Sequence, residues 1–315
     1  MRDFAVLESP ATHQARAAER EEAQLVALYR QVVVDVVRTH PVGAYQLFEC
    51  EQTRGALTRA LFVWSHAHSD LGYFQGLNEL VTPLFVALLC EQTDGARITP
   101  AAVARLSAEQ LCAVEARLYD CLDALMGALV PLVDAAASHL HSEHMLVLFD
   151  AVLRWAAPRL AENLERKCLC TIQYAFRWCL CLFLRELPLR DALVAWDHII
   201  SDRDGPAFGT LTVYIAAAYL LQLAPVLVNL STEDSVMLLN SPPIRWDSTA
   251  TTALLDAALA LRHAHTAAQK SPAAALPVLP DVPPPQTWYT IVQKAKTLQQ
   301  QQQQQRKPQQ QKQQH

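Results

Sequence analysis

The stretch LGYFQGLNEL, residues 71–80, decides how the chain is interpreted. The sequence of 315 residues has only eight glycines, and two of them, Gly72 and Gly76, lie on either side of a neutral polar side chain, Gln75. Glycine allows the backbone to turn sharply or to approach another molecule closely. We therefore expect this segment to present Gln75 to a partner.

A second short element, VVVDVVRTHP, covers residues 32–41. Asp35 precedes Arg38 by three residues, a spacing at which the two side chains can pair or fix one another's direction. The valines favour extended structure and Pro41 limits a helix, so we expect a short irregular segment around 32–41. Taken singly, Arg38 is an ordinary surface arginine and Gln75 is a polar residue near a helix start.

The remainder of the body is predicted to be all-α. Apolar residues recur at helical spacing through most of residues 15–266, as at Leu57, Leu61 and Trp64, and alternating strand patterns are scarce. Residues 1–266 are therefore assigned to a helical body. Residues 267–287 are proline-rich and predict a stiff linker. Residues 288–315 contain a short amphipathic segment and a glutamine-rich tail, for which disorder is favoured over a docking helix.

Charge and composition exclude several classes of protein. No acid follows Asp281 while five bases do, which leaves 31 acidic and 21 basic residues upstream, a net charge of −10. Such an acidic body argues against nucleic-acid binding. The first residues do not resemble a secretion signal, so the eight cysteines are expected to be reduced thiols. The uncharged stretch 205–232 is long enough to span a bilayer, but a buried helix is favoured.

Neither nucleotide-binding glycine motifs nor a serine-hydrolase elbow occur in the sequence. His139, His141 and His144 form a histidine cluster without a fourth ligand in reach, so a metal-dependent hydrolase is disfavoured. Four cysteines cluster near residue 175 but cannot meet around one metal on one helix, and core thiols are favoured there. They are Cys168, Cys170, Cys179 and Cys181. No metal site is predicted.

Three motifs in order resemble the TBC domain, the family of GTPase-activating proteins for Rab GTPases. They are Val-x-x-Asp-x-x-Arg-Thr at 32–39, Tyr-x-Gln-Gly at 73–76, and FRWCLCLFLRELPLRDALVAWD at 176–197. The resemblance covers roughly residues 8–265 and is strongest to the branch of the yeast Golgi Rab-GAP and its animal relatives. It implies an all-α fold of two helical lobes forming a cleft, with a boundary near residue 130 and both functional residues on the first lobe.

The resemblance also assigns roles to individual residues. Arg38 is expected to act as an arginine finger and Gln75 as a glutamine finger, both supplied in trans to the GTPase. Supporting roles fall to four neighbours of these two residues: Asp35, Tyr73, Gly76 and Asn78. The third motif is expected to be structural, with core tryptophans and an internal pair or cap at Arg185 and Glu186. Its residues are Arg177, Trp178, Arg185, Glu186, Trp196 and Asp197.

The implied function is acceleration of GTP hydrolysis on a GTP-bound Rab, with no cofactor of the chain's own, because the partner carries GTP and Mg²⁺. The implied location is the cytoplasm, at the surface of Golgi or endosomal membranes, with membrane contact through the partner or the tail. The family's usual opening, a Trp-containing helix and a Leu-x-Gly-x-x-Pro segment, is absent before residue 8. This departure favours the alternative of a TBC-shaped Rab-binding scaffold with weak or no catalysis. Residues 145–166 are expected to add an extra helix.

Overall fold

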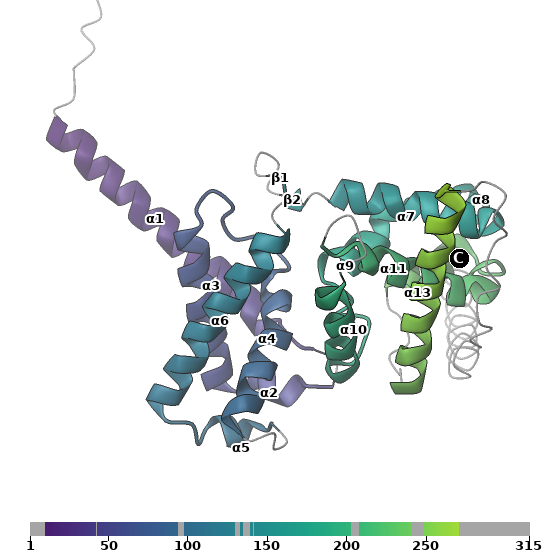
Figure 1. Ribbon diagram of the computed structural model, residues 1–315. Coiled ribbons are helices and arrows are strands. Elements are labelled where there is room, and N and C mark those ends of the chain that lie inside the picture. The colour runs from purple at the N-terminus through teal and green to yellow at the C-terminus, as the bar shows by residue number, and fades with distance from the viewer. Residues whose placement is uncertain are drawn as a thin grey trace, which may run out of the picture. The chain divides into compact units, whose positions relative to one another are not determined.

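The computed structural model describes residues 10–41, 43–93, 98–129, 133–134, 139–140, 142–202, 208–240 and 248–270. The chain divides into two compact units, Met1–Leu140 and His141–His315. Almost all described residues outside turns are helical, which confirms the all-α prediction (Figure 1). The described strands are two residues long each, β1 (Val133–Asp134) and β2 (His139–Leu140), and pair antiparallel.

The first unit is built around four long helices that pack on one another. They are α1 (Pro10–Val37), α3 (Glu51–Ala67), α4 (Leu77–Gln92) and α6 (Ala108–Leu129). Two short helices, α2 (Tyr45–Glu49) and α5 (Pro100–Val103), lie in the connections. Leu57, Leu61 and Trp64 share one face of α3 and are buried, as their spacing predicted. The N-terminal half of α1 projects beyond the other helices of this unit (Figure 1).

The expectation of a short irregular segment at 32–41 is wrong for most of its length. Helix α1 continues without interruption to Val37, and only the residues after it leave the helix. Val32 and Val36 lie four residues apart and are 0% and 2% exposed, so both point into the core of the unit. Burial of this stripe outweighs the modest preference of valine for extended structure, because propensity is a weak term beside tertiary packing.

The second unit surrounds one buried helix, α11 (Thr210–Leu227), which packs against α7, α9, α10 and α13. The other elements are α7 (Ser142–Ala156), α8 (Pro158–Arg166), the 3₁₀ turn η2 (Thr171–Gln173), α9 (Ala175–Leu180), α10 (Leu189–Ser201), α12 (Thr232–Asn240) and α13 (Ser248–Lys270). Among the described residues, α11 is the one helix long and apolar enough to cross a membrane, and 78% of it is buried inside the protein. Its burial agrees with the core helix predicted for 205–232.

The stretch 145–166 forms parts of two helices instead of the single extra helix expected. Helix α7 ends at Ala156 and α8 begins at Pro158, with Ala157 outside both at φ −146° and ψ 67°. Proline has no N–H to donate and disfavours helical backbone at the preceding residue, which favours a break between the two helices here. At the other end of the unit, α13 continues past residue 266 to Lys270. The predicted linker beyond Lys270 and the glutamine-rich tail lie outside the described residues.

The cysteine prediction holds for two of the four clustered thiols. Cys179 and Cys181 are buried, as expected of core thiols, whereas Cys168 and Cys170 are exposed. The segment is not one helix either, because the η2 turn and Tyr174 separate these exposed thiols from α9. All eight cysteines of the chain are free.

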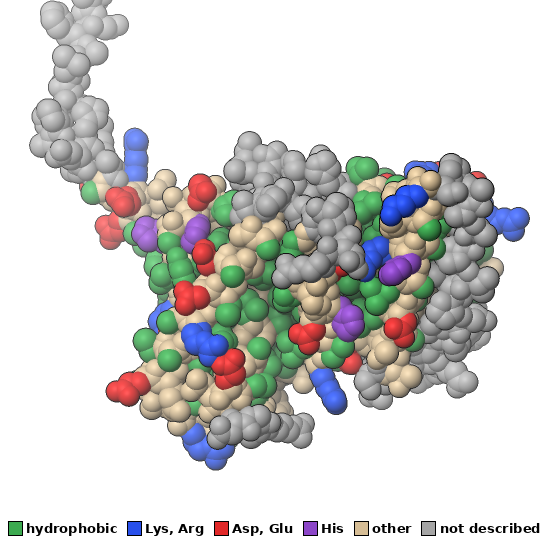
Figure 2. Space-filling view, viewed as in Figure 1, with side chains coloured by type: hydrophobic (Ala, Val, Ile, Leu, Met, Phe, Trp, Pro, Cys, Tyr) green, Lys and Arg blue, Asp and Glu red, His purple; other side chains and the backbone are tan. Residues whose placement is uncertain are grey.

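On the face drawn in Figure 2, acidic and basic side chains of the described residues are scattered among hydrophobic ones.

The buried histidine of α13 predicts a pH-dependent stability. His265 is 6% exposed, its Nδ1 lies 3.0 Å from the Tyr214 hydroxyl, and burial lowers its pKa. The unfolded chain therefore binds the proton more readily than the folded one. The contribution of neutral His265 to stability is complete at pH values above its unfolded-state pKa of about 6.5, and it is lost as the pH falls through the folded-state pKa. We expect the melting temperature to fall between about pH 7.5 and pH 5.5, and to fall less in His265→Gln.

Differential scanning calorimetry across this range measures the effect. His263→Gln is the matched control, because His263 is exposed on the same helix and its loss should leave the wild-type pH dependence in place. A His265→Gln curve parallel to that of the wild type would contradict the assignment.

Candidate functional site

Arg38 lies immediately after the last residue of α1. The backbone N–H groups of Arg38 and Thr39 donate to the carbonyls of Asp35 and Val36 at 3.0 and 3.1 Å, which closes the final turn. The Thr39 hydroxyl also donates to the Asp35 carbonyl, at 2.9 Å. The Arg38 side chain is exposed, and it makes no hydrogen bond or ion pair with any residue that the structure describes. A fixed backbone thus carries a guanidinium that is available to a partner.

Gln75 lies in the connection between α3 and α4. Gly72 has φ 64° and donates its N–H to the His68 carbonyl at 2.7 Å, and Gly76 has φ 112° at the N-terminus of α4. Both values are in the region that favours glycine, so the backbone itself requires these two residues. The Gln75 side chain between them is exposed and has no hydrogen-bond partner among the described residues. The geometry thus agrees with presentation of Gln75 to a partner.

Asn78 joins the two segments. Its side-chain Oδ1 accepts from the N–H of Gly76 at 3.2 Å, and its Nδ2 donates to the Thr39 hydroxyl at 2.9 Å. A longer contact of 3.5 Å runs from Nδ2 to the Asp35 carbonyl. Asn78 and Thr39 are 4% and 0% exposed, so water cannot readily replace these bonds. One buried amide therefore fixes the residue next to Gln75 relative to the residue next to Arg38.

A second bond links the same two segments through Tyr73 and Asp35. The Tyr73 hydroxyl donates to Asp35 Oδ2 at 3.1 Å. Burial, with the negative charge of Asp35 beside it, raises the pKa of Tyr73, so this hydroxyl stays protonated and remains a donor. The Asp35 carboxylate has no bond to the Arg38 guanidinium, in contrast to the direct pairing that their spacing allowed. Asp35 instead holds the Gln75 connection against the end of α1.

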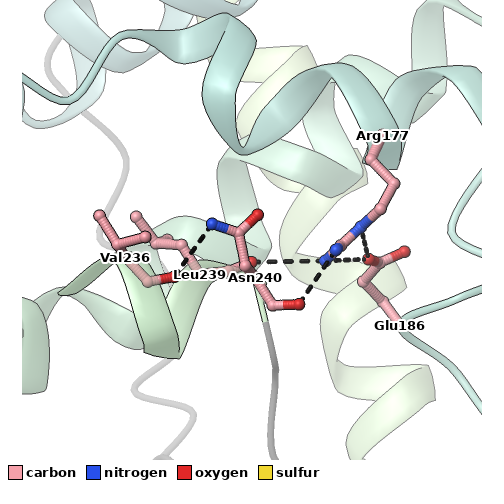
Figure 3. A network of polar contacts seen from close by, with 5 residues as sticks. All are labelled: Arg177, Glu186, Val236, Leu239 and Asn240. Atoms are coloured by element: carbon pink, nitrogen blue, oxygen red, sulfur yellow. Dashed lines mark hydrogen bonds and ion pairs between the residues drawn. The ribbon is translucent and has the colours of Figure 1, made fainter. Parts of the chain in front are cut away.

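The residues of the third motif form a separate cluster in the second unit. Arg177 donates from Nε to Glu186 Oε1 at 2.8 Å, and its other nitrogens reach the carbonyls of Asn240 and Leu239 at 3.0 and 3.5 Å (Figure 3). Glu186 is 0% exposed, and this ion pair offsets part of the cost of burying its charge. The sequence predicted an internal pair or cap at Arg185 and Glu186, and the structure shows an ion pair between Glu186 and Arg177. The cluster ties α9 to the end of α12.

Both tryptophans of this motif are core residues. Trp178 is 0% exposed and packs edge-on against Tyr219 of α11, with ring centroids 5.0 Å apart. Trp196 is 2% exposed, and its indole N–H donates to the Leu182 carbonyl at 3.0 Å. Leu182 has φ 46°, a left-handed value that is uncommon for leucine and that this bond helps to hold. Arg185 and Asp197 are exposed.

Comparison with known proteins decides the family. The sequence model of the Rab-GTPase-TBC domain matches residues 9–227. The chain belongs to this family. Human TBC1 domain family member 22A is 29% identical over 238 residues, which is 75% of this chain and 45% of that protein. The GTPase-activating protein gyp1 of Schizosaccharomyces pombe is 28% identical over 227 residues, which is 70% of this chain and 42% of that protein.

Solved structures agree at the level of the fold. The crystal structure of the Ypt/Rab-GAP domain of Gyp1p superposes with a TM-score of 0.65 at 23% identity, covering 81% of this chain and 75% of that one. The match of the family model confirms as family membership the resemblance drawn from the three motifs. The chain spans less than half the length of the curated relatives it matches.

One member of this TBC site was not singled out from the sequence. This residue is Thr39 of the first motif. Its hydroxyl accepts a hydrogen bond from the Asn78 amide and donates one to the Asp35 carbonyl. The threonine directly after Arg38 in the motif was the signal that could have pointed to it.

Among the described residues no group of three or more His, Cys, Asp or Glu could hold a metal ion. The side chains of His139, His141 and His144 lie outside the described part of the chain, so the histidine cluster stays untested.

The hydrogen bonds that Asn78 makes to Gly76 and Thr39, here called the Asn78 bridge, predict that substitutions at Asn78 and Thr39 are energetically coupled. Asn78→Ala leaves the Gly76 N–H without its acceptor in a buried place, so we expect it to lower the free energy of unfolding by about 1–3 kcal/mol. Thr39→Val removes the other end of the bond with little change of shape. In a double-mutant cycle measured by urea denaturation, the two changes should couple by about 0.5 kcal/mol or more.

Thr93→Ala supplies the control for this cycle. Thr93 lies at the far end of α4, about 22 Å along the helix from Asn78. It bonds the Leu89 carbonyl, so its effect should add to that of Asn78→Ala. If the effects of Asn78→Ala and Thr39→Val on the free energy of unfolding also add, the hydrogen bond between Asn78 and Thr39 does not contribute to stability.

Proposed function

We propose that this chain accelerates GTP hydrolysis on a Rab-family GTPase in its GTP-bound state, with Arg38 and Gln75 as groups supplied in trans. The observation that supports this most directly is the state of these two side chains. Both are exposed and without a described partner, although the residues next to them, Thr39 and Gly76, are linked through buried hydrogen bonds of the Asn78 side chain. Groups held on a rigid frame but left unsatisfied are suited to act on another molecule.

Arg38 would offset the negative charge that builds on the phosphoryl oxygens as the γ-phosphate is transferred to water. An arginine supplied in trans accelerates such hydrolysis by roughly 10³–10⁵-fold. The planar fork of the guanidinium donates two parallel hydrogen bonds, a geometry that matches phosphate oxygens and that a lysine ammonium does not reproduce. The exposed position of Arg38 at the end of α1 is compatible with this reach.

Gln75 would hold the attacking water. A side-chain amide can accept a hydrogen bond from the water through its oxygen and donate to the γ-phosphate through its nitrogen. A carboxylate at this position would place a negative charge beside the phosphate, so a neutral amide is the better choice. The Asn78 bridge keeps the two segments in fixed register, which saves the ordering cost at the moment of reaction.

GTP and Mg²⁺ are part of the substrate complex in this proposal, and the chain adds no cofactor. A Rab partner would bring the protein to the cytoplasmic surface of endomembranes, such as those of the Golgi or endosomes. The competing function is a Rab-binding scaffold of TBC shape without catalysis. Single-turnover hydrolysis across a panel of GTP-loaded Rabs distinguishes the two, because a scaffold would bind a Rab but leave its rate unchanged.

Substitution of Arg38 should separate binding from chemistry. We expect Arg38→Ala to retain the fold and most Rab affinity, because the side chain has no described internal partner, yet to lose about 10³-fold in stimulated rate. Arg38→Lys should also be poor, since it lacks the fork. Arg105→Ala, another exposed arginine of the first unit, should stay near wild type. Near-normal stimulation by Arg38→Ala would rule out the proposed role.

Substitution of the GTPase's own glutamine tests Gln75. If Gln75 orients the water, a Rab whose switch glutamine is changed to leucine should still respond to this protein in the single-turnover assay. Gln75→Ala should lose stimulation on both the normal and the altered Rab, and Gln75→Glu should be no better because of its charge. Full activity of Gln75→Ala, with response limited to the glutamine-containing Rab, would leave Arg38 as the sole acting residue.

A further inference from the structure

The residue that follows α3, His68, has a side chain that is held on three sides. Its ring lies on the indole of Trp64, with centroids 4.4 Å apart and planes at 17°. Its Nδ1 lies 2.9 Å from the Trp64 carbonyl oxygen, and its Nε2 lies 2.9 Å from Oδ1 of Asp123 on α6. Trp64 is 0% exposed, so the histidine ring rests on a core residue. The His68 side chain therefore has one defined orientation, although it is 30% exposed.

Asp123 joins the end of α3 to a second helix. Its Oδ1 also accepts from the Trp64 indole N–H at 3.2 Å, so one carboxylate oxygen holds both rings. Both oxygens that face the His68 nitrogens are acceptors. A ring with N–H on both nitrogens donates to both of them, whereas a neutral ring donates to one. Helix α6 thus fixes the end of α3 through Asp123, in addition to the packing of the two helices.

The backbone of His68 begins the connection that contains Gln75. His68 has φ −109° and ψ 57°, so the chain leaves the helix at this residue. Its carbonyl accepts from the N–H groups of Leu71 and Gly72, at 3.1 and 2.7 Å. Gln75 follows three residues later, and the far end of the connection is fixed by the Asn78 bridge. The orientation of the His68 carbonyl thus sets the direction in which the connection starts.

The contact between His68 and Asp123 contributes little to the stability of the whole unit. The Asp123 side chain is 51% exposed, and pairs exposed to that degree are weakened by water. What the contact fixes is local, because the rotamer of a side chain is coupled to the φ and ψ of its own residue. Holding the ring therefore restrains the turn at which the chain leaves α3. Groups that act on another molecule need such support, since their position must be held to within about 0.5 Å.

We infer that His68 is a positioning residue for Gln75 and that Asp123 acts through it. The inference rests on the proposed function. In this assignment His68 touches neither the phosphate nor the water of the partner, and it fixes the start of the connection as the Asn78 bridge fixes its end. With both ends held, Gln75 is presented in one place, so less ordering remains at the moment of reaction. Loss of this support lowers kcat and leaves KM unchanged.

Asp123→Ala in the full chain removes the acceptor and leaves the histidine in place. We expect kcat for hydrolysis by a GTP-loaded Rab to fall about tenfold or more, because displacement of an acting group by about 1 Å can cost about 10²-fold. KM should stay within about twofold, and the melting temperature should stay near that of the wild type. Asp123→Asn keeps an oxygen to which both rings can donate, so it should restore most of kcat. Asp120→Ala, which removes another exposed acid of α6, is the matched control.

A double-mutant cycle shows whether the network acts through Gln75. In a Gln75→Ala background, Asp123→Ala should have no further effect on kcat, since the group that it positions is gone. The free chain supplies a readout that needs no partner. Amide hydrogen exchange at Leu71 and Gly72 should accelerate in Asp123→Ala and stay unchanged in Asp120→Ala.

The possible outcomes are distinct. Unchanged kcat in Asp123→Ala, with stimulation by the wild type intact, would overturn the inference and leave the proposed function standing. An equal fall in kcat with and without Gln75 would show that the network supports another part of the site and would likewise overturn it. A lower melting temperature with normal kcat would leave His68 as a structural cap of α3. If the wild type binds a GTP-loaded Rab without stimulating it, the proposed function fails, while the exchange comparison still decides whether the network holds the Gln75 connection.

Discussion

The hydrogen bonds of one buried side chain, Asn78, determine how the candidate site is assembled. Its amide oxygen holds the N–H of Gly76 and its amide nitrogen holds the hydroxyl of Thr39, so it connects the start of α4 to the end of α1. Gly76 lies just before α4 and Thr39 just after α1, so these bonds fix two residues at helix ends relative to one another. Because the amide is 4% exposed, failure to make either bond would leave a polar group without water, which penalises other arrangements.

Two arginines of the protein illustrate how the same side chain serves opposite purposes. Arg177 satisfies its guanidinium internally, on a carboxylate that is 0% exposed and on the carbonyls that end α12. Its removal would take this ion pair from a buried carboxylate, so Arg177 helps to hold the second unit together. Arg38 leaves its guanidinium exposed, and its backbone alone is fixed. A group that contributes little to folding can be given entirely to a partner, so under the proposed function activity and stability would depend on different arginines.

The candidate site was predictable to the extent that its signals are local. Two glycines around Gln75 indicated a presented side chain, and both have the positive φ that requires glycine. The link between the segments was not predictable from spacing. Asp35 pairs with Tyr73 instead of Arg38, because the α3–α4 connection folds back onto the end of α1. Contacts between residues so far apart in sequence depend on how helices pack, which local patterns do not encode.

The sequence by itself determined the helical class, the core face of α3 and the exposure of Gln75, because helical periodicity and glycine conformation are properties of a few neighbouring residues. Only the tertiary structure decided that α1 runs through its valines to Val37, since burial of Val32 and Val36 outweighs their intrinsic preference. It also decided that Glu186 meets Arg177. The choice of partner for a buried charge depends on which groups the fold brings within reach, and that is set by the packing of whole helices.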